Sequence, residues 1–189
     1  MCLSGRSILV SDFKVEDMSL TLLPGFSRLP RSLDENPRRE QVLHLLGANT
    51  RLLWPGSRIS VALVGITPCL GEALKSVCHA KQLVRGLELA EQRLAREQQG
   101  LTIAEKKTGL QRGERVSRLL LLADDGAERF YRNVEGLLRR HAPRVMAVML
   151  RSDSATLGDL VFGSGSLARL LLIEHKDAVT HVLLSMAQE

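Results

Sequence analysis

Three stretches in the last third of the chain decide the fold: SRLLLLADD (117–125), RVMAVMLR (144–151) and ARLLLIE (168–174). Each is an almost continuous aliphatic run of strand length, without the alternation of apolar and polar residues that marks a strand with one wet face. GAERFYRNVEGLLRRHA (126–142) lies between the first two and has the composition of a helix, and DAVTHVLLSMA (177–187) follows the third. Strands buried on both faces and joined by helices predict an α/β fold arranged as a three-layer α/β/α sandwich.

The chain before residue 117 predicts further elements of the same kinds. REQVLHLLGAN (39–49) has apolar residues at helical spacing, and TRLLWPGSRISVALVGITPCLG (50–71) predicts two strands around a Pro55-Gly56 turn. GEALKSVCHAKQLVRGLELAEQRLAREQQG (71–100) predicts two helical pieces, interrupted near Gly86 by a break or a short strand. The polar segment after residue 100 is expected to be a helical or looped excursion.

Composition limits the classes of function. The chain has 189 residues, 44% of them hydrophobic but only 3% aromatic, so an aliphatic core leaves little ring surface for stacking bases. The net charge of +5 is uneven: residues 1–116 hold 17 Lys+Arg against 12 Asp+Glu, and residues 117–189 hold 9 of each. A basic excess is compatible with a polyanion partner and is also common on solvated surfaces.

Targeting and cysteine patterns favour a cytoplasmic protein. Residues 1–26 have no apolar run long enough for a secretory signal, and no stretch reaches the roughly 18 apolar residues of a membrane span. The three cysteines form no CxxC pair, which predicts neither a disulfide framework nor a zinc ribbon. We therefore expect a soluble protein that does not contact a membrane and uses no cofactor.

Asp124 and Asp125 admit two interpretations. Paired carboxylates at the end of a strand can hold a metal ion in phosphoryl transfer, and Asp153 after the next strand is the candidate for a third ligand. Asp is also a preferred residue at the start of a helix, where it caps free amides and its charge complements the dipole. The second interpretation is favoured. His141 is likewise expected to interact with the dipole at the end of its helix, which Pro143 stops.

The order of elements resembles the second half of the L7Ae/L30e family of RNA-binding proteins. The positions that carry the resemblance are Ala123 with Asp125, the Leu157-Gly158 pair that would open a short helix, Gly163 or Gly165, and Ala168 before a strand. Upstream, HAKQLVRGLELAEQRL (79–94) is similar to the bacterial branch of the family. The resemblance covers roughly residues 75–189 and implies an L30e-like fold and noncatalytic recognition of structured RNA or a ribosomal particle.

Two departures from the family pattern stand out. The usual Gly-x-Asn-Glu-x-x-Lys run falls on residues 86–92, where Glu88 replaces the Asn and Gln92 replaces the Lys. A charged insertion at about 95–113 has no counterpart. The expected organisation is an extended or partly disordered arm (1–40), a small α/β extension packed on the main domain (41–74), and the L7Ae/L30e-like domain (75–189).

If RNA is bound, Lys and Arg near a helix N-terminus should contact its phosphates. The resemblance and the charges give as RNA-binding candidates Lys81, Arg85, Gly86, Glu88, Arg93, Arg96, Asp125, Leu157, Gly158 and Ser164. Further basic candidates in the excursion are Lys106, Lys107, Arg112 and Arg115. The alternative is a protein-interaction or assembly module that keeps the fold without binding RNA, with a partner on the N-terminal arm or on the 95–113 excursion. A metal-dependent enzyme using Asp124 and Asp125 is the least favoured reading.

Overall fold

The computed structural model describes residues 28–109 and 115–188. The described elements are, in chain order, α1 (Arg31–Asp34), α2 (Arg39–Ala48), β1 (Thr50–Leu52), β2 (Ser60–Val64), α3 (Pro68–His79), β3 (Leu83–Arg85), α4 (Leu87–Thr108), β4 (Arg118–Leu122), α5 (Glu128–His141), β5 (Val145–Leu150), α6 (Ser154–Phe162), β6 (Leu170–Ile173) and α7 (Lys176–Met186). Most of the expected arm, residues 110–113 of the expected insertion, and Arg112 lie outside the described residues. None of the described helices combines the length and apolarity that crossing a membrane requires.

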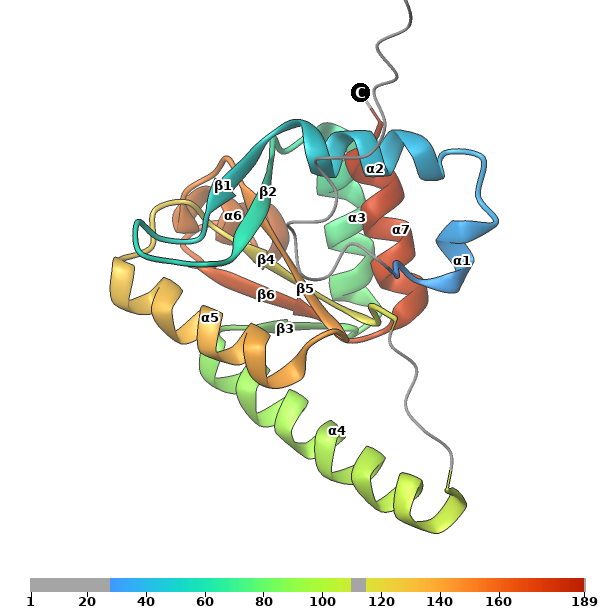
Figure 1. Ribbon diagram of the computed structural model, residues 1–189. Coiled ribbons are helices and arrows are strands. Elements are labelled where there is room, and N and C mark those ends of the chain that lie inside the picture. Colours follow the sequence, from blue (N-terminus) through green and yellow to red (C-terminus); the bar gives the residue numbers. More distant parts are fainter. Residues whose placement is uncertain (1–27, 110–114, 189) are drawn as a thin grey trace, which may run out of the picture.

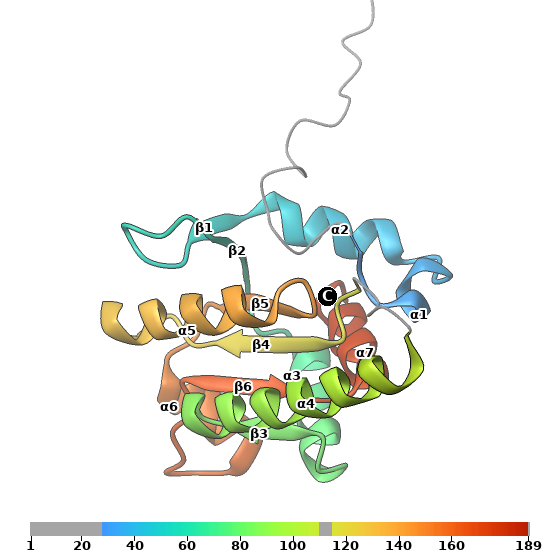
Figure 2. The ribbon, with the colours of Figure 1, turned by 60° about the horizontal axis from the view of Figure 1, so that its bottom comes forward.

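The strands form one six-stranded sheet in the order β1-β2-β5-β4-β6-β3. The central strands β2, β5 and β4 are parallel, while β1 and β6 run antiparallel to their neighbours and β3 runs antiparallel to β6. Helices α4 and α5 cover one face, and α2, α3 and α7 cover the other (Figures 1 and 2). The predicted α/β/α sandwich is therefore confirmed.

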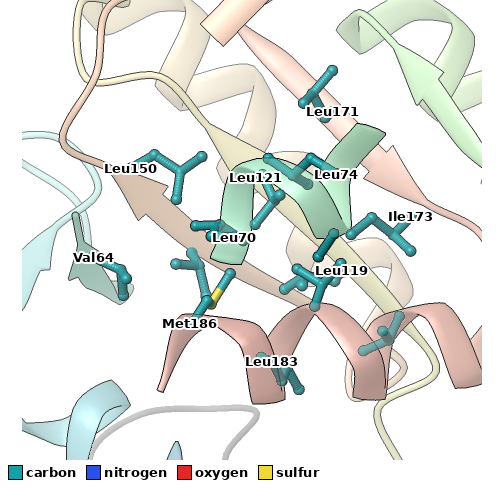
Figure 3. Packing of buried hydrophobic residues seen from close by; sticks show 14 of the residues in the cluster. Val64, Leu70, Leu74, Leu119, Leu121, Leu150, Leu171, Ile173, Leu183 and Met186 are labelled. Atoms are coloured by element: carbon teal, nitrogen blue, oxygen red, sulfur yellow. The ribbon is translucent and has the colours of Figure 1, made fainter. Parts of the chain in front are cut away.

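The aliphatic strands fill both faces because successive side chains of a strand point to opposite sides. Leu119 and Leu121 pack with α3 and α7, as Figure 3 shows. Leu120 and Leu122, the residues between and after them, pack under α4 and α5. All four leucines are fully buried, which explains why this strand has no polar position.

The upstream elements follow the sequence closely. Ser57 N–H donates to Trp54 O across the Pro55-Gly56 turn (2.9 Å), and β1 and β2 pair antiparallel around it as predicted. The predicted interruption near Gly86 is the short strand β3, after which Gly86 has φ +93° and begins α4. The described part of the expected insertion is helical, one of the two expected forms, and it continues α4 without a break to Thr108. Its residues are mostly good helix formers, so propensity alone supports this continuation.

Candidate nucleic-acid interface

The ends of the strands form two borders of the sheet, which we call the carboxyl edge and the amino edge. Every candidate residue lies near one of these two borders. At the carboxyl edge β2, β3, β4 and β5 end and β6 begins, as the register shows: Leu122 lies opposite Leu170, and Arg85 lies opposite Leu171. Helices α3, α4, α5 and α6 all begin at this edge. At the opposite amino edge β3, β4 and β5 begin, β6 ends and α7 begins.

The turn between β4 and α5 shows what Asp124 and Asp125 do. The N-cap residue of α5 is Ala127, with no side-chain cap, so the expectation that the aspartates cap this helix is wrong. Asp125 instead accepts a hydrogen bond from Ser154 Oγ at the start of α6 (2.7 Å). The two carboxylates come three and two residues before the N-cap position, and that of Asp125 joins two neighbouring loops.

Tyr131 stabilises the same turn from within α5. Its hydroxyl donates to Ala123 O (2.7 Å) and accepts from Gly126 N–H (3.0 Å). Burial raises the pKa of Tyr131 above its ordinary value, so the hydroxyl stays protonated and can keep donating. The sequence analysis missed this residue, because a tyrosine in a helix has the pattern of an ordinary core residue until its hydrogen-bond partner is known.

Asp153 caps α6. Its carboxylate accepts from Thr156 N–H (2.7 Å) and from the Thr156 hydroxyl (3.2 Å), and these hydrogen bonds lower the pKa of Asp153. Within residues 28–109 and 115–188, no three His, Cys, Asp or Glu side chains are grouped so that they could hold a metal ion. Two of the three carboxylates named for the enzyme reading, those of Asp125 and Asp153, are thus engaged with Ser154 and Thr156.

Leu157 and Gly158 have packing roles. The helix α6 begins at Ser154, three residues before the expected start, and Leu157 is fully buried in the core. A Cβ on Gly158 would lie 2.2 Å from Ser166 O, so only glycine lets α6 approach the backbone of the following loop this closely. In that loop Ser164 is exposed.

Arg85, Gly86 and Glu88 come together at the start of α4. Gly86 N–H donates to Leu170 O (2.8 Å), and the helix has no side-chain cap. The Arg85 guanidinium lies over the Phe162 ring, 5.0 Å from its centre. Glu88 occupies the first turn and is exposed, so a carboxylate already complements the positive helix end.

The other predicted contacts lie towards the amino edge. Lys81 precedes the first residue of β3 and has φ +57°. Arg93 pairs with Glu174, which follows β6 (3.7 Å between Nε and Oε1). Arg96 is the neighbour of Glu97, whose carboxylate contacts arginines that flank β4 and β5. The ten predicted residues are therefore divided between opposite edges of the sheet and do not form one site.

Charge distinguishes the two edges. The segments flanking the strands at the carboxyl edge (65–67, 85–88, 124–128, 151–153 and 163–169) contain the acidic residues Glu88, Asp124, Asp125, Glu128 and Asp153 and the basic residues Arg85, Arg151 and Arg169. The segments at the amino edge (80–82, 115–118, 142–144 and 174–177) contain the basic residues Lys81, Arg115, Arg118, Arg144 and Lys176 and the acidic residues Glu174 and Asp177. The carboxyl edge is net negative, and the amino edge stays net positive when Asp34, which pairs with Arg115, and Glu97, which pairs with Arg118 and Arg144, are added to its segments.

Sequence reasoning missed Arg118, Arg144 and Lys176 on the amino edge. The first two stand directly before the buried runs of β4 and β5, and the third follows β6. The signal was present, because basic residues at the starts of neighbouring parallel strands must lie at one edge. It was read as ordinary surface charge.

His141 lies beside this edge, at the end of α5. Burial and then the positive charges of Arg140 and Arg144 lower its pKa, which favours the neutral imidazole. A neutral imidazole gains little from the helix dipole, and the Nδ1 atom of His141 has no hydrogen-bond partner among the described residues, so the structure gives the expected role of His141 no support. The helix does end at His141, two residues before Pro143.

Comparison with known proteins gives distant structural likenesses. No family model matches the chain, and no curated protein matches its sequence. A solved protein of unknown function from Bacillus halodurans is 14% identical with a TM-score of 0.45, covering 66% of this chain and all of its own. The 15.5kD RNA binding protein of Giardia lamblia is 15% identical with a TM-score of 0.41, covering 63% of this chain and 82% of its own.

Proposed function

We propose that this protein binds structured RNA without catalysing a reaction, and that the RNA lies on the amino edge of the sheet. The single observation that supports this is the contrast in charge between the two edges. Phosphate contacts by Lys and Arg supply most of the affinity for nucleic acid. The amino edge presents such groups on four adjacent segments, and α4 adds Arg96 beside them.

The placement differs from the one that the sequence resemblance implies. In the resemblance, the RNA contacts gather at the start of α4, where Arg85, Gly86 and Glu88 stand. Glu88, Asp124 and Asp125 would repel a phosphate backbone there, and the hydroxyl of Ser154 is engaged with Asp125. Lys81 and Arg96 lie at the other edge, where basic residues outnumber Glu174 and Asp177 in the flanking segments, so they are the better contacts among the predicted residues.

The test is filter binding of the purified protein to a kink-turn RNA and to a mixed pool of structured RNA. Over about 50 to 200 mM salt, an interface with several phosphate contacts loses affinity steeply, and each lost contact lowers the slope of log K against log salt by about 1. Lys81→Glu and Arg96→Glu should weaken binding for all sequences and flatten this slope. Both side chains are exposed, so the fold should tolerate the changes.

Matched controls are Arg151→Glu and Arg169→Glu, which make the same charge change on exposed arginines of the carboxyl edge. They should leave binding nearly unchanged. If the carboxyl-edge variants lose affinity and the amino-edge variants do not, the RNA lies where the family resemblance puts it. Absence of salt-sensitive binding in the wild type rejects the RNA function.

A second candidate function, protein assembly, is favoured by two exposed leucines. Leu89 in the first turn of α4 is 54% exposed and Leu167 before β6 is 62% exposed. Both lie on segments of the carboxyl edge, which the Gly86–Leu170 hydrogen bond joins. Exposed apolar side chains rimmed by charges are typical of protein contacts. Loss of a co-purifying protein in a Leu89→Ser, Leu167→Ser variant that still binds RNA would show a separate assembly surface.

A further inference from the structure

The basic edge contains a hollow whose lining is mostly cationic. It has a volume of about 420 Å³ and is lined by Glu97, Leu101, Arg115, Ser117, Arg118, Arg144, His175 and Lys176. These residues come from α4, from the segments before β4 and β5, and from the start of α7. Four of them are Lys or Arg and Glu97 is the acidic member, and of the four cations Arg115 is already paired with Asp34.

Glu97 cannot neutralise both arginines that reach it. Arg118 uses both carboxylate oxygens, with Nε donating to Oε2 (3.1 Å) and Nη2 to Oε1 (2.5 Å). Arg144 Nη2 lies 2.8 Å from Oε1 but out of hydrogen-bonding geometry, so both of its terminal nitrogens have no acceptor. Two guanidinium groups sharing one carboxylate leave one positive charge in excess.

The excess charge is on a buried group. Arg144 is only 7% exposed, and its carbonyl oxygen accepts from Ser117 N–H and Arg118 N–H (2.9 and 3.1 Å), which fixes its backbone. A buried charge that must share its counterion is costly unless a further anion and hydrogen-bond acceptors compensate it. A guanidinium with spare donors is well suited to the oxygens of a phosphate group.

We propose that this hollow binds one phosphate group, with Arg144 supplying the uncompensated charge and Lys176 a second cation at its mouth. The start of α7 at Lys176 adds amide dipoles of the favourable sign. Phosphate fits better than a carboxylate, because several cations converge and a phosphate offers more acceptor oxygens. The phosphate belongs either to a bound RNA or to a free phosphate or phosphate monoester. A phosphate of RNA as the ligand rests on the proposed function, whereas a free phosphate or phosphate monoester does not.

The first arm uses inorganic phosphate as the probe. Thermal denaturation is followed in phosphate and in chloride at equal ionic strength for the wild type, Arg144→Met, Lys176→Gln and the control Arg129→Gln. Arg129 is an exposed arginine on α5, at the other end of the sheet. We expect specific stabilisation in the wild type and control, a weaker effect in Lys176→Gln, and a loss of apparent affinity of about 10-fold or more in Arg144→Met, because a charge-assisted contact is removed.

Arg144→Met should fold, because Arg118 still neutralises Glu97 and an apolar side chain of similar length replaces the excess charge. If Arg144→Met does not fold, the Lys176→Gln variant, which changes an exposed position, is used to test the proposal by its weaker stabilisation in phosphate. Equal stabilisation of all four proteins by phosphate overturns the proposal, since it would be a general effect of the salt.

The second arm measures RNA affinity of the wild type and Arg144→Met. If phosphate binding and RNA binding are both lost in the variant, the hollow holds a phosphate of the RNA. If phosphate binding alone is lost, the ligand is a free phosphate or monoester. If the wild type binds phosphate but no RNA, the proposed function fails while this inference stands.

Discussion

Glu135 gives the sharpest test of how the β1–β2 turn is fixed to the rest of the fold. This α5 residue is 6% exposed, and its Oε2 accepts hydrogen bonds from Trp54 Nε1 (2.5 Å) and Ser57 Oγ (2.9 Å). Arg139, one turn later on α5, pairs with the same carboxylate. Burial alone would raise the pKa of Glu135, but the hydrogen bonds from Ser57 and Trp54 and the charge of Arg139 outweigh it, so its pKa lies below its ordinary value.

Replacing Glu135 by Ala leaves two donors of the turn without an acceptor. Each orphaned buried donor costs about 1–3 kcal/mol, and Trp54 is only half-buried, so we expect a loss of about 3 kcal/mol. For a chain of this size that corresponds to a melting temperature lower by about 6–12 °C. Urea unfolding at neutral pH, followed by circular dichroism, measures the loss directly.

The pH dependence gives an independent readout through Glu135→Gln, which keeps the shape and removes the charge. Because the folded pKa lies below the unfolded value of about 4.3, the carboxylate stabilises the fold fully above that value. This contribution is lost as the pH falls through the folded pKa. The difference in unfolding free energy between wild type and Glu135→Gln should therefore shrink below about pH 5.

The control is Glu128→Gln, on the same helix. Glu128 pairs with Arg132 four residues later, and both side chains are half-exposed, so a change within about 0.5 kcal/mol is expected. A loss below about 1 kcal/mol for Glu135→Ala, or a Glu135→Gln difference that does not vary with pH, would refute the reasoning.

Three further substitutions test packing and hydrogen bonding in α5 and α6. Gly158→Ala should destabilise by about 3 kcal/mol, because the new methyl group would meet Ser166 O at 2.2 Å and backbone cannot move aside cheaply; Gly136→Ala, where nothing lies within 4 Å, should instead stabilise α5 by about 0.5–1 kcal/mol. Tyr131→Phe removes the donor to Ala123 O and should lower the free energy of unfolding by about 1–2 kcal/mol. Denaturant titration of each variant against wild type checks all three values.

The fold was predictable from sequence because the strands β4, β5 and β6 are buried on both faces. A run such as Leu119–Leu122 cannot lie on a wet surface, and the helices between such runs supply the two outer layers. The Pro55-Gly56 turn and the interruption near Gly86 were found for local reasons, since proline and glycine restrict or permit particular backbone angles. The length of α4 was not foreseen, because alignment to a family suggested an insertion where helix propensity is continuous.

The functions of individual side chains were less predictable, because they depend on tertiary partners. Asp125 was read as a helix cap from its neighbours in sequence, whereas its hydrogen bond goes to Ser154, 29 residues away. Leu157 and Gly158 were candidates for RNA contact, and in the fold Leu157 is buried while Gly158 lies against the backbone of Ser166. In each case the local pattern predicted the helix or strand correctly but gave no information about the residues that pack against it.

The amino edge shows how strand polarity can be turned into a prediction of charge. In parallel strands, residues that precede the buried run all lie at one edge, so Arg118 and Arg144 were bound to be neighbours once β4 and β5 were recognised as parallel. Burying β5 from Val145 onward forces Arg144 to the boundary between core and solvent. The single negative charge of Glu97 on α4 cannot then balance the positive charges of both guanidinium groups. The same buried pattern that builds the sheet therefore places an excess positive charge at its edge, and an anionic ligand at this position would offset it.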